Sequence, residues 1–239
     1  MDVKIFEDKF ALGKAAAALG AEKIRAAIAK KGSANVILAT GASQFEMLAA
    51  LLEEKNIDWS VVKFFHLDEY VGLPAENDQS YRYFMNDNLF NHINIRKDHT
   101  FVPNGLAKDV NAECAEYEKR IEELGGIDLQ LLGIGGNGHV GFNEPSDAFD
   151  TVTHVVELKA STREANARFF ASIDEVPTHA LTMGLKGIMG AKKVLLVANG
   201  PQKAEIVEKA FFGPVTPEVP ASILQLHPDV TVIYTASKD

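Results

Sequence analysis

Residues 127–139 read Ile-Asp-Leu-Gln-Leu-Leu-Gly-Ile-Gly-Gly-Asn-Gly-His, a short apolar run that ends in a glycine-rich loop. Its length and composition predict a β-strand. Similar runs occur elsewhere in the chain, at residues 35–39, 61–67, 194–198 and 230–234. Strands without a polar face are typical of a parallel sheet that is covered on both sides. We therefore expect these runs to form one buried sheet.

Helical patterns alternate with these strands. They cover about residues 6–31, 45–52, 80–92, 110–124 and 162–171, with one more helix after Gly200 and one more strand at 152–158. This alternation predicts an α/β fold with a single doubly wound, mostly parallel sheet and helices on both faces, as in Rossmann-like proteins. No linker, charge block or repeat divides the chain, so we expect one domain over residues 1–239.

Composition excludes several classes of protein. The 239 residues are 46% hydrophobic and carry a net charge of −9, which is typical of a globular protein and argues against general nucleic-acid binding. The apolar runs are far shorter than the roughly 20 residues needed to cross a bilayer, and the first residues show no signal-peptide pattern. The single cysteine, Cys114, excludes a disulfide framework. We expect a cytoplasmic protein with no membrane contact.

The fold class locates a site before any motif is considered. In open α/β sheets, ligands bind beyond the carboxyl ends of the strands. The loops expected there are residues 40–43, 68–70, 133–144 and 199–203. Three of these loops contain glycine, which lets backbone N–H groups approach a ligand closely.

The glycine-rich loop matches a dinucleotide-binding pattern in its spacing but not in its context. Gly133, Gly135 and Gly138 fit G-x-G-x-x-G after a strand, and Glu157 lies about 20 positions further on. The pattern requires a helix to begin at its last glycine, whereas residues 139–145 show no helical period. We therefore expect no dinucleotide-binding site in this loop.

Polar residues in two loops are candidates for proton transfer. His139 lies near Asn143 and Glu144, and a histidine beside a carboxylate can shuttle protons at neutral pH, although a lone loop histidine is as often only solvated. Asp68 leaves an apolar strand, so burial would raise its pKa and make it a candidate base. Asp68 and Glu69 could equally form a helix cap.

Another loop could bind phosphate. Thr40, Gly41, Ala42 and Ser43 stand between a strand and a helix, where backbone N–H groups and hydroxyls suit an anion, although Ser43 could simply cap the helix. Arg168 and Lys203 would supply positive charge, although most such side chains are only solvated. The seven histidines show no metal-ligand spacing, so we expect no metal.

Several long motifs resemble the glucosamine-6-phosphate deaminase (isomerase) family. They read Leu-Asp-Glu-Tyr-Val-Gly-Leu-Pro at 67–74, Gly-Ile-Gly-Gly-Asn-Gly-His-Val-Gly-Phe-Asn-Glu-Pro at 133–145, Thr-Arg-Glu-Ala-Asn-Ala-Arg-Phe-Phe at 162–170, Gly-Pro-Gln-Lys-Ala at 200–204 and Leu-Gln-Leu-His-Pro at 224–228. They occur in the family's order over nearly the whole chain.

The resemblance implies that D-glucosamine 6-phosphate and water become D-fructose 6-phosphate and ammonia in amino-sugar catabolism, without a cofactor. It assigns Asp68 as the base that moves a proton between C2 and C1. It further implies that His139 opens the sugar ring, with Glu144 as its acidic partner and Asn137 as its neighbour. The matching substrate-binding residues are Thr40, Gly41, Ala42, Ser43, Gly135, Gly138, Arg168 and Lys203.

Two positions depart from the family's common pattern. Many relatives have Asp where this chain has Asn137, which can orient His139 but cannot stabilise the imidazolium ion by charge. The phosphate loop reads Thr-Gly-Ala-Ser-Gln at 40–44, where a Pro commonly stands at the last position. Sugar preference therefore stays open.

Three other functions remain as alternatives: a galactosamine-6-phosphate deaminase, a 6-phosphogluconolactonase-like hydrolase and a non-catalytic sugar-phosphate-sensing module. Some family members are hexamers regulated through a C-terminal extension. Here only five residues follow Tyr234, so we expect the short form, with hyperbolic kinetics, as a monomer or small homo-oligomer.

Overall fold

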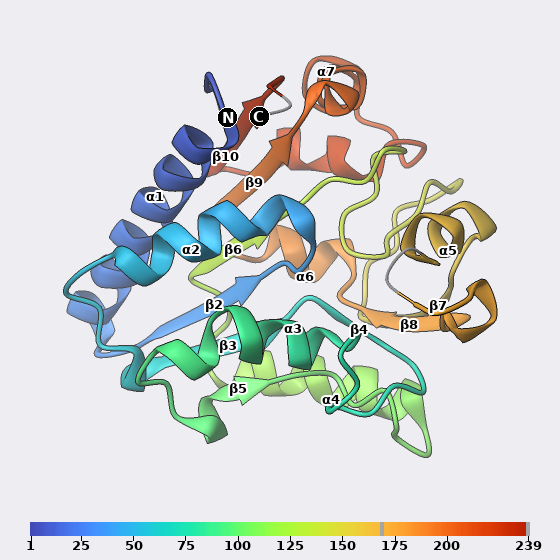
Figure 1. The fold of residues 1–239 in the computed structure, drawn as a ribbon, viewed down its shortest axis with the longest axis horizontal. Helices are drawn as coiled ribbons and strands as arrows, with labels where there is room; N and C mark the ends of the chain where they lie inside the picture. Colours follow the sequence, from blue (N-terminus) through green and yellow to red (C-terminus); the bar gives the residue numbers. More distant parts are fainter. Residues whose placement is uncertain (168–169, 238–239) are drawn as a thin grey trace.

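The computed structural model describes residues 1–167 and 170–237. Within this part of the chain, seven strands form one parallel sheet in the order β1-β10-β9-β6-β2-β3-β5 (Figure 1). The strands are β1 Asp2–Ile5, β2 Ala34–Leu38, β3 Val62–His66, β5 Thr100–Phe101, β6 Leu129–Leu132, β9 Val194–Asn199 and β10 Val230–Thr235. The predicted parallel sheet is thus confirmed.

Helices cover both faces of this sheet, as expected. They are α1 Lys9–Lys31, α2 Phe45–Glu53, α3 Tyr81–Asn88, α4 Val110–Glu123, α6 Leu185–Met189 and α7 Ala204–Phe212, whereas α5 Ala160–Asn166 lies apart from this sheet, on the right of Figure 1. In β9, Leu195 and Val197 pack in the apolar cluster of α1 and α2, whereas Leu196 and Ala198 pack in that of α6 and α7. Successive strand residues point to opposite faces, so both faces of β9 are buried.

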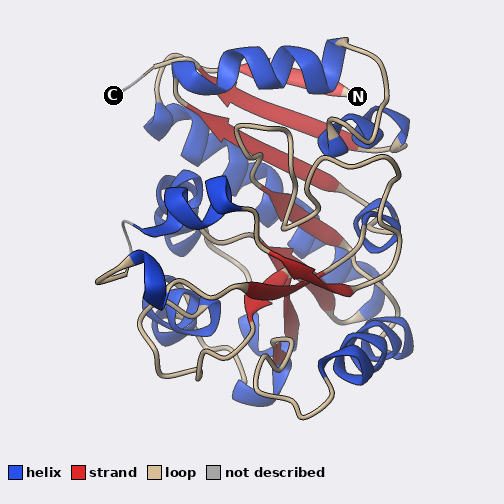
Figure 2. Cartoon of the chain, turned by 90° about the vertical axis from the view of Figure 1, so that its right-hand side faces the viewer, coloured by secondary structure: helices blue, strands red, loops and turns tan. Residues whose placement is uncertain are grey.

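A second, smaller sheet extends the expected architecture. It is antiparallel and joins β4 Asp68–Tyr70, β8 His179–Thr182 and β7 His154–Glu157. Figure 2 views the molecule from the side on which this sheet lies in Figure 1. The predicted run 61–67 ends in the large sheet at His66, and Asp68 opens a strand of the small one. The predicted strand at 152–158 also belongs to the small sheet.

Helix ends follow local capping chemistry. Helix α1 begins at Lys9, later than residue 6, because the Asp8 side chain accepts a hydrogen bond from the Ala11 N–H at 2.7 Å. It ends at Gly32, whose φ of 79° suits a residue without a Cβ. The helix expected at 80–92 ends at Asn88, and a separate short 3₁₀ turn follows at Phe90–His92. No helix of the described residues is both long and apolar enough to cross a membrane.

Candidate active site

The strand order reverses in the middle of the large sheet. From β2 the chain proceeds outward through β3 and β5, whereas from β6 it proceeds the other way through β9 and β10. Ligands bind at such a switch point, beyond the carboxyl ends of the strands. The loops that leave β2, β6 and β9 there carry residues 40–43, 133–144 and 200–203. The structure therefore brings three of the predicted loops to one edge of the sheet.

The loop after β6 folds tightly around its glycines. The Gly135 N–H donates to the carbonyl of His139 at 2.9 Å, and the Gly138 N–H donates to the carbonyl of Gly135 at 3.0 Å. A Cβ at Gly135 would lie only 2.2 Å from the His139 ring, so the imidazole packs against bare backbone. Gly138 has a φ of 90°, a conformation that favours glycine. No helix begins at Gly138, as the lack of a helical period in residues 139–145 predicted.

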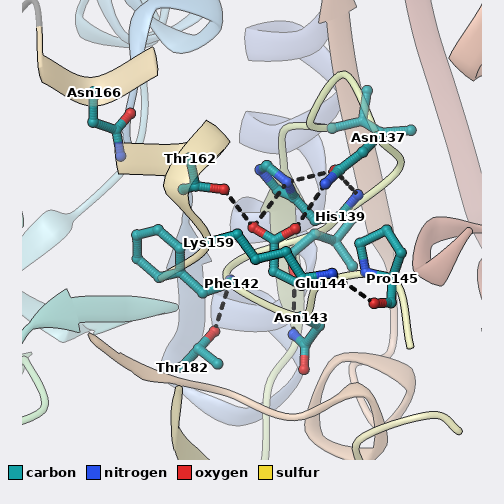
Figure 3. Close-up of polar contacts among 12 residues, drawn as sticks. Asn137, His139, Phe142, Asn143, Glu144, Pro145, Lys159, Thr162, Asn166 and Thr182 are labelled. Carbon is teal, nitrogen blue, oxygen red and sulfur yellow. Dashed lines mark hydrogen bonds and ion pairs between the residues drawn. The ribbon is translucent and has the colours of Figure 1, made fainter. Parts of the chain in front are cut away.

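A chain of hydrogen bonds joins three of the predicted polar residues (Figure 3). The Nδ1 of His139 lies 2.7 Å from the Oδ1 of Asn137. The Nδ2 of Asn137 donates to the Oε2 of Glu144 at 2.7 Å, and the other carboxylate oxygen lies 3.6 Å from the His139 Nδ1. Asn137 thus bridges the imidazole and the carboxylate.

This chain fixes the tautomer of His139. The Asn137 amide can donate to Glu144 only through Nδ2, so its Oδ1 faces the imidazole as an acceptor. Nδ1 of His139 must therefore carry a proton, which leaves Nε2 free to accept one when the ring is neutral. Burial lowers the pKa of His139; the charge of Glu144 opposes this effect and that of Lys203 adds to it. The neutral ring is thus favoured, with 25% of its side chain exposed.

The small sheet connects this loop to Asp68. Asp68 pairs with Thr182 across the β4–β8 ladder. The Thr182 hydroxyl accepts a hydrogen bond from the N–H of Phe142 at 3.0 Å, and the Asn143 amide donates to the Met183 carbonyl at 2.8 Å. Strand β8 therefore holds both Asp68 and the loop that contains His139.

Asp68 is a buried carboxyl group, with only 7% of its surface exposed. Burial, with a smaller contribution from the charge of Glu69, raises its pKa to about 8. The prediction that burial raises this pKa is confirmed. The neighbouring Glu69 instead accepts backbone N–H bonds from Tyr70, Tyr81 and Arg82 at 2.9–3.1 Å, so it satisfies two N–H groups in the first turn of α3. The N-cap of that helix is Ser80, and the alternative that Asp68 and Glu69 form an N-cap pair is wrong, because both lie in β4.

The predicted phosphate loop lies beside the glycine-rich loop. Gly41 has a φ of 106° and precedes a 3₁₀ turn at Ala42–Gln44. A Cβ at Gly133 would lie 3.4 Å from the Ser43 hydroxyl, so the two loops are in contact. Thr40 lies in the segment between β2 and this 3₁₀ turn, at the same edge of the large sheet.

One of the two predicted cations, Lys203, lies at the glycine-rich loop. The Lys203 ammonium donates to the carbonyl of Ile134, which brings it to the glycine-rich loop, and burial lowers its pKa. Arg168 lies outside the described residues. Among the described residues, no cluster of three or more His, Cys, Asp or Glu side chains could hold a metal ion.

Two contacts of the site escaped the sequence analysis. The Thr162 hydroxyl donates to the Oε1 of Glu144 at 2.6 Å, and the Asn166 amide donates to the Tyr70 hydroxyl at 2.9 Å. Both donors lie in helix α5, which the sequence predicted without a role. The only signal was their place in the motif at 162–170, because no local pattern indicates a contact over 18 residues.

A family model described as glucosamine-6-phosphate isomerases/6-phosphogluconolactonase matches residues 7–233. The chain belongs to this family. The resemblance seen in the sequence motifs is therefore confirmed. The matched range includes the whole small sheet and every predicted site residue, whereas strand β1 lies before it.

Relatives within the family narrow the comparison. The chain is 60% identical over 213 residues to the glucosamine-6-phosphate deaminase of Lachnoclostridium phytofermentans, covering 88% of this chain and 90% of the relative. It is 57% identical over 199 residues to that of Clostridium perfringens, covering 82% of each. A solved structure described as a monomeric glucosamine-6-phosphate deaminase has a TM-score of 0.93 and 42% identity, covering 98% of this chain and 97% of that one.

A 6-phosphogluconolactonase of Thermotoga maritima also superimposes on the chain. Its TM-score is 0.78 over 99% of each chain, but its identity is 19%. This likeness shows a shared fold alone. The deaminases of the family resemble the chain more closely in both sequence and structure.

Proposed function

We propose that this protein is a glucosamine-6-phosphate deaminase, which converts D-glucosamine 6-phosphate and water to D-fructose 6-phosphate and ammonia. One observation carries the proposal. A buried carboxyl group, Asp68, pairs with Thr182 of strand β8, and the same Thr182 is hydrogen-bonded to the loop that holds the His139–Asn137–Glu144 chain. Such a site offers a carbon base and a separate proton shuttle, which this reaction needs at different atoms. The names of the similar proteins support the same activity.

His139 would open the pyranose ring. Its free Nε2 takes the proton of the sugar's C1 hydroxyl and delivers it to the ring oxygen O5 as the C1–O5 bond breaks, so that an aldehyde forms. As Nε2 takes up its proton, positive charge develops on the imidazole. Glu144 stabilises that charge from 3.6 Å, while Asn137 holds Nδ1 in place.

Asp68 would then move a proton from C2 to C1. Its carboxylate removes the C2 proton while the aldehyde oxygen takes a proton from the C2 ammonium group, so that an enol-type intermediate forms. Asp68 then returns its proton to C1, which leaves an iminium group at C2. Water adds to that carbon and ammonia leaves, so fructose 6-phosphate forms. A base with a pKa near the working pH is well matched to both halves of this transfer.

The phosphate would bind where the loops after β2, β6 and β9 meet. Thr40, Gly41, Ala42 and Ser43 offer hydroxyls and N–H groups, and Gly135 and Gly138 let the adjoining backbone come close. Lys203, with Arg168 as a second cation, would supply positive charge. Binding energy at the phosphate then orients the reacting carbons.

We further propose that the protein acts as a cytoplasmic monomer without metal or cofactor. The similar solved deaminase is described as monomeric, and each proposed step is a proton transfer or hydrolysis that side chains can perform. The free thiol of Cys114 is buried, as suits a reducing compartment.

The experiment that tests the function compares three substrates with the purified protein. Glucosamine 6-phosphate should release ammonia and fructose 6-phosphate in equal amounts. Galactosamine 6-phosphate should react much more slowly, and 6-phosphogluconolactone should hydrolyse no faster than in buffer. Preferential turnover of the galactosamine epimer or of the lactone would contradict the proposal.

A further inference from the structure

Helix α5 contacts neighbouring segments through two side chains one turn apart, of which Thr162 reaches Glu144 of the proposed site (Figure 3). The Thr162 hydroxyl donates to the Oε1 of Glu144 at 2.6 Å. Four residues later, the Asn166 amide donates to the Tyr70 hydroxyl at 2.9 Å. Residues four apart lie on the same face of a helix, so one face of α5 contacts both the glycine-rich loop and β4.

The contact with Glu144 is the more informative of the two. Each carboxylate oxygen has one directed donor: Asn137 Nδ2 on Oε2 and the Thr162 hydroxyl on Oε1. Thr162 is 8% exposed and Glu144 is 7% exposed, so water competes little with these bonds. Two donors on two oxygens stop the carboxylate from turning about its last bond. The oxygen that Thr162 holds is the one that lies 3.6 Å from Nδ1 of His139.

We infer that Thr162 is a positioning residue for ring opening, because its hydroxyl holds Oε1 of Glu144 toward the imidazole of His139. This inference rests on the proposed function. In the Thr162→Val variant the carboxylate would keep its charge but lose its fixed direction. The charge that develops on His139 in the transition state would then be less well stabilised.

The structure separates this role from simple anchoring of the helix. Other contacts hold α5 and its flanks without Thr162. Asn166 donates to Tyr70, Arg163 donates to the carbonyls of Ile173 and Val176, and Lys159 donates to the carbonyl of Pro145. Removal of one hydroxyl therefore leaves the helix in place. Asn166→Ala, which loosens the helix and leaves Glu144 untouched, is the matched control.

The test measures ammonia release by the wild type and by Thr162→Val, Thr162→Ser and Asn166→Ala. We expect Thr162→Val to lower kcat about tenfold with KM changed less than about twofold, since a hydrogen bond to a charged group is lost in the transition state. Thr162→Ser keeps the hydroxyl and should restore at least half of kcat. Asn166→Ala should keep kcat within about threefold of the wild type.

A binding measurement completes the test. The open-chain alditol obtained by reducing glucosamine 6-phosphate needs no ring opening, so Thr162→Val should bind it with wild-type affinity. An unchanged kcat in Thr162→Val, failure of Thr162→Ser to restore it, equal losses in Asn166→Ala or weakened alditol binding would each overturn the inference. A wild type that releases no ammonia would instead overturn the proposed function.

Discussion

At the scale of single residues, burial of Asp68 raises its pKa into the range that suits a general base. A carboxylate with 7% exposure loses most of its hydration, and the nearby Glu69 adds like charge, so the pKa of Asp68 rises to about 8. Burial raises the pKa of Tyr81 and of Tyr117, and the charge of Asp68 adds to both shifts, so both phenols are neutral at ordinary pH.

The activity should therefore depend on pH in a defined direction. Only the ionised form of Asp68 accepts a proton, and below about pH 8 the free protein holds mostly the neutral form. We expect kcat/KM to rise with pH and to level off above about 8. A profile of kcat/KM between pH 6 and 9 checks this, and a value that stays constant over that range would contradict the assignment.

The same shift predicts a cost in stability. The folded pKa of Asp68 lies above its ordinary value of 3.8, so between about pH 4 and pH 8 the folded state binds more protons than the unfolded state. Folding stability from this group is thus full below pH 4 and is lost as pH rises toward 8.

Asp68→Asn removes that dependence. Its free energy of unfolding should exceed the wild-type value at pH 8 and approach it at pH 4. Urea unfolding of both proteins at the two pH values measures the difference. A variant less stable than the wild type at pH 8 would show that Asp68 is held by interactions stronger than its desolvation.

Asn137 is a neutral link in the hydrogen-bonded chain, so Glu144 is the acidic group of that chain. Its amide oxygen lies 2.7 Å from Nδ1 of His139, and its amide nitrogen donates to Glu144 at 2.7 Å. Asn137→Asp would place negative charge beside the imidazole and replace a donor to Glu144 by an acceptor. We expect a higher pKa for His139, because the added negative charge favours the imidazolium form.

The pH profile of the Asn137→Asp variant tests this expectation. The limb of kcat/KM that belongs to His139 should move to higher pH relative to the wild type. A His139→Gln variant, which lacks that limb, identifies it. If the limb moves to lower pH or stays where it is, Asn137 does not control the charge of the imidazole.

At the scale of elements, the glycine-rich loop offers a matched pair of substitutions. In Gly135→Ala, the new methyl group would lie 2.2 Å from the His139 ring, so the imidazole must shift. At Gly136 nothing lies within 4 Å of such a group. We expect Gly135→Ala to lower kcat at least about tenfold and Gly136→Ala to keep nearly full activity. Equal activity of the two variants in the ammonia assay would place His139 outside the reaction.

The sequence predicted the long elements well because each carries its own pattern. The buried runs of β2, β6, β9 and β10 lack a polar face, and α1 ends at a glycine that its conformation requires. The small sheet was missed. Its strands β4 and β8 have three and four residues, too few for a period, and they pair only because the tertiary fold brings them together.

At the scale of the whole molecule, topology explains why the sequence could place three loops of the candidate site at one edge of the sheet. The reversal between β2 and β6 collects loops from distant parts of the sequence at one edge. His139, Asn137 and Glu144 lie within eight residues, so their proximity was readable. The contact of Thr162 with Glu144 was not, because it depends on where the small sheet and α5 pack.

In the proposed reaction, Asp68 moves the proton from C2 to C1 before ammonia is released. The most direct test is the kcat for ammonia release from glucosamine 6-phosphate by Asp68→Asn, whose amide keeps the size of the side chain but cannot accept the proton. We predict that kcat falls at least about 10²-fold, while the variant still binds the open-chain alditol with wild-type affinity. A folded Asp68→Asn protein with kcat within about threefold of the wild type would contradict it.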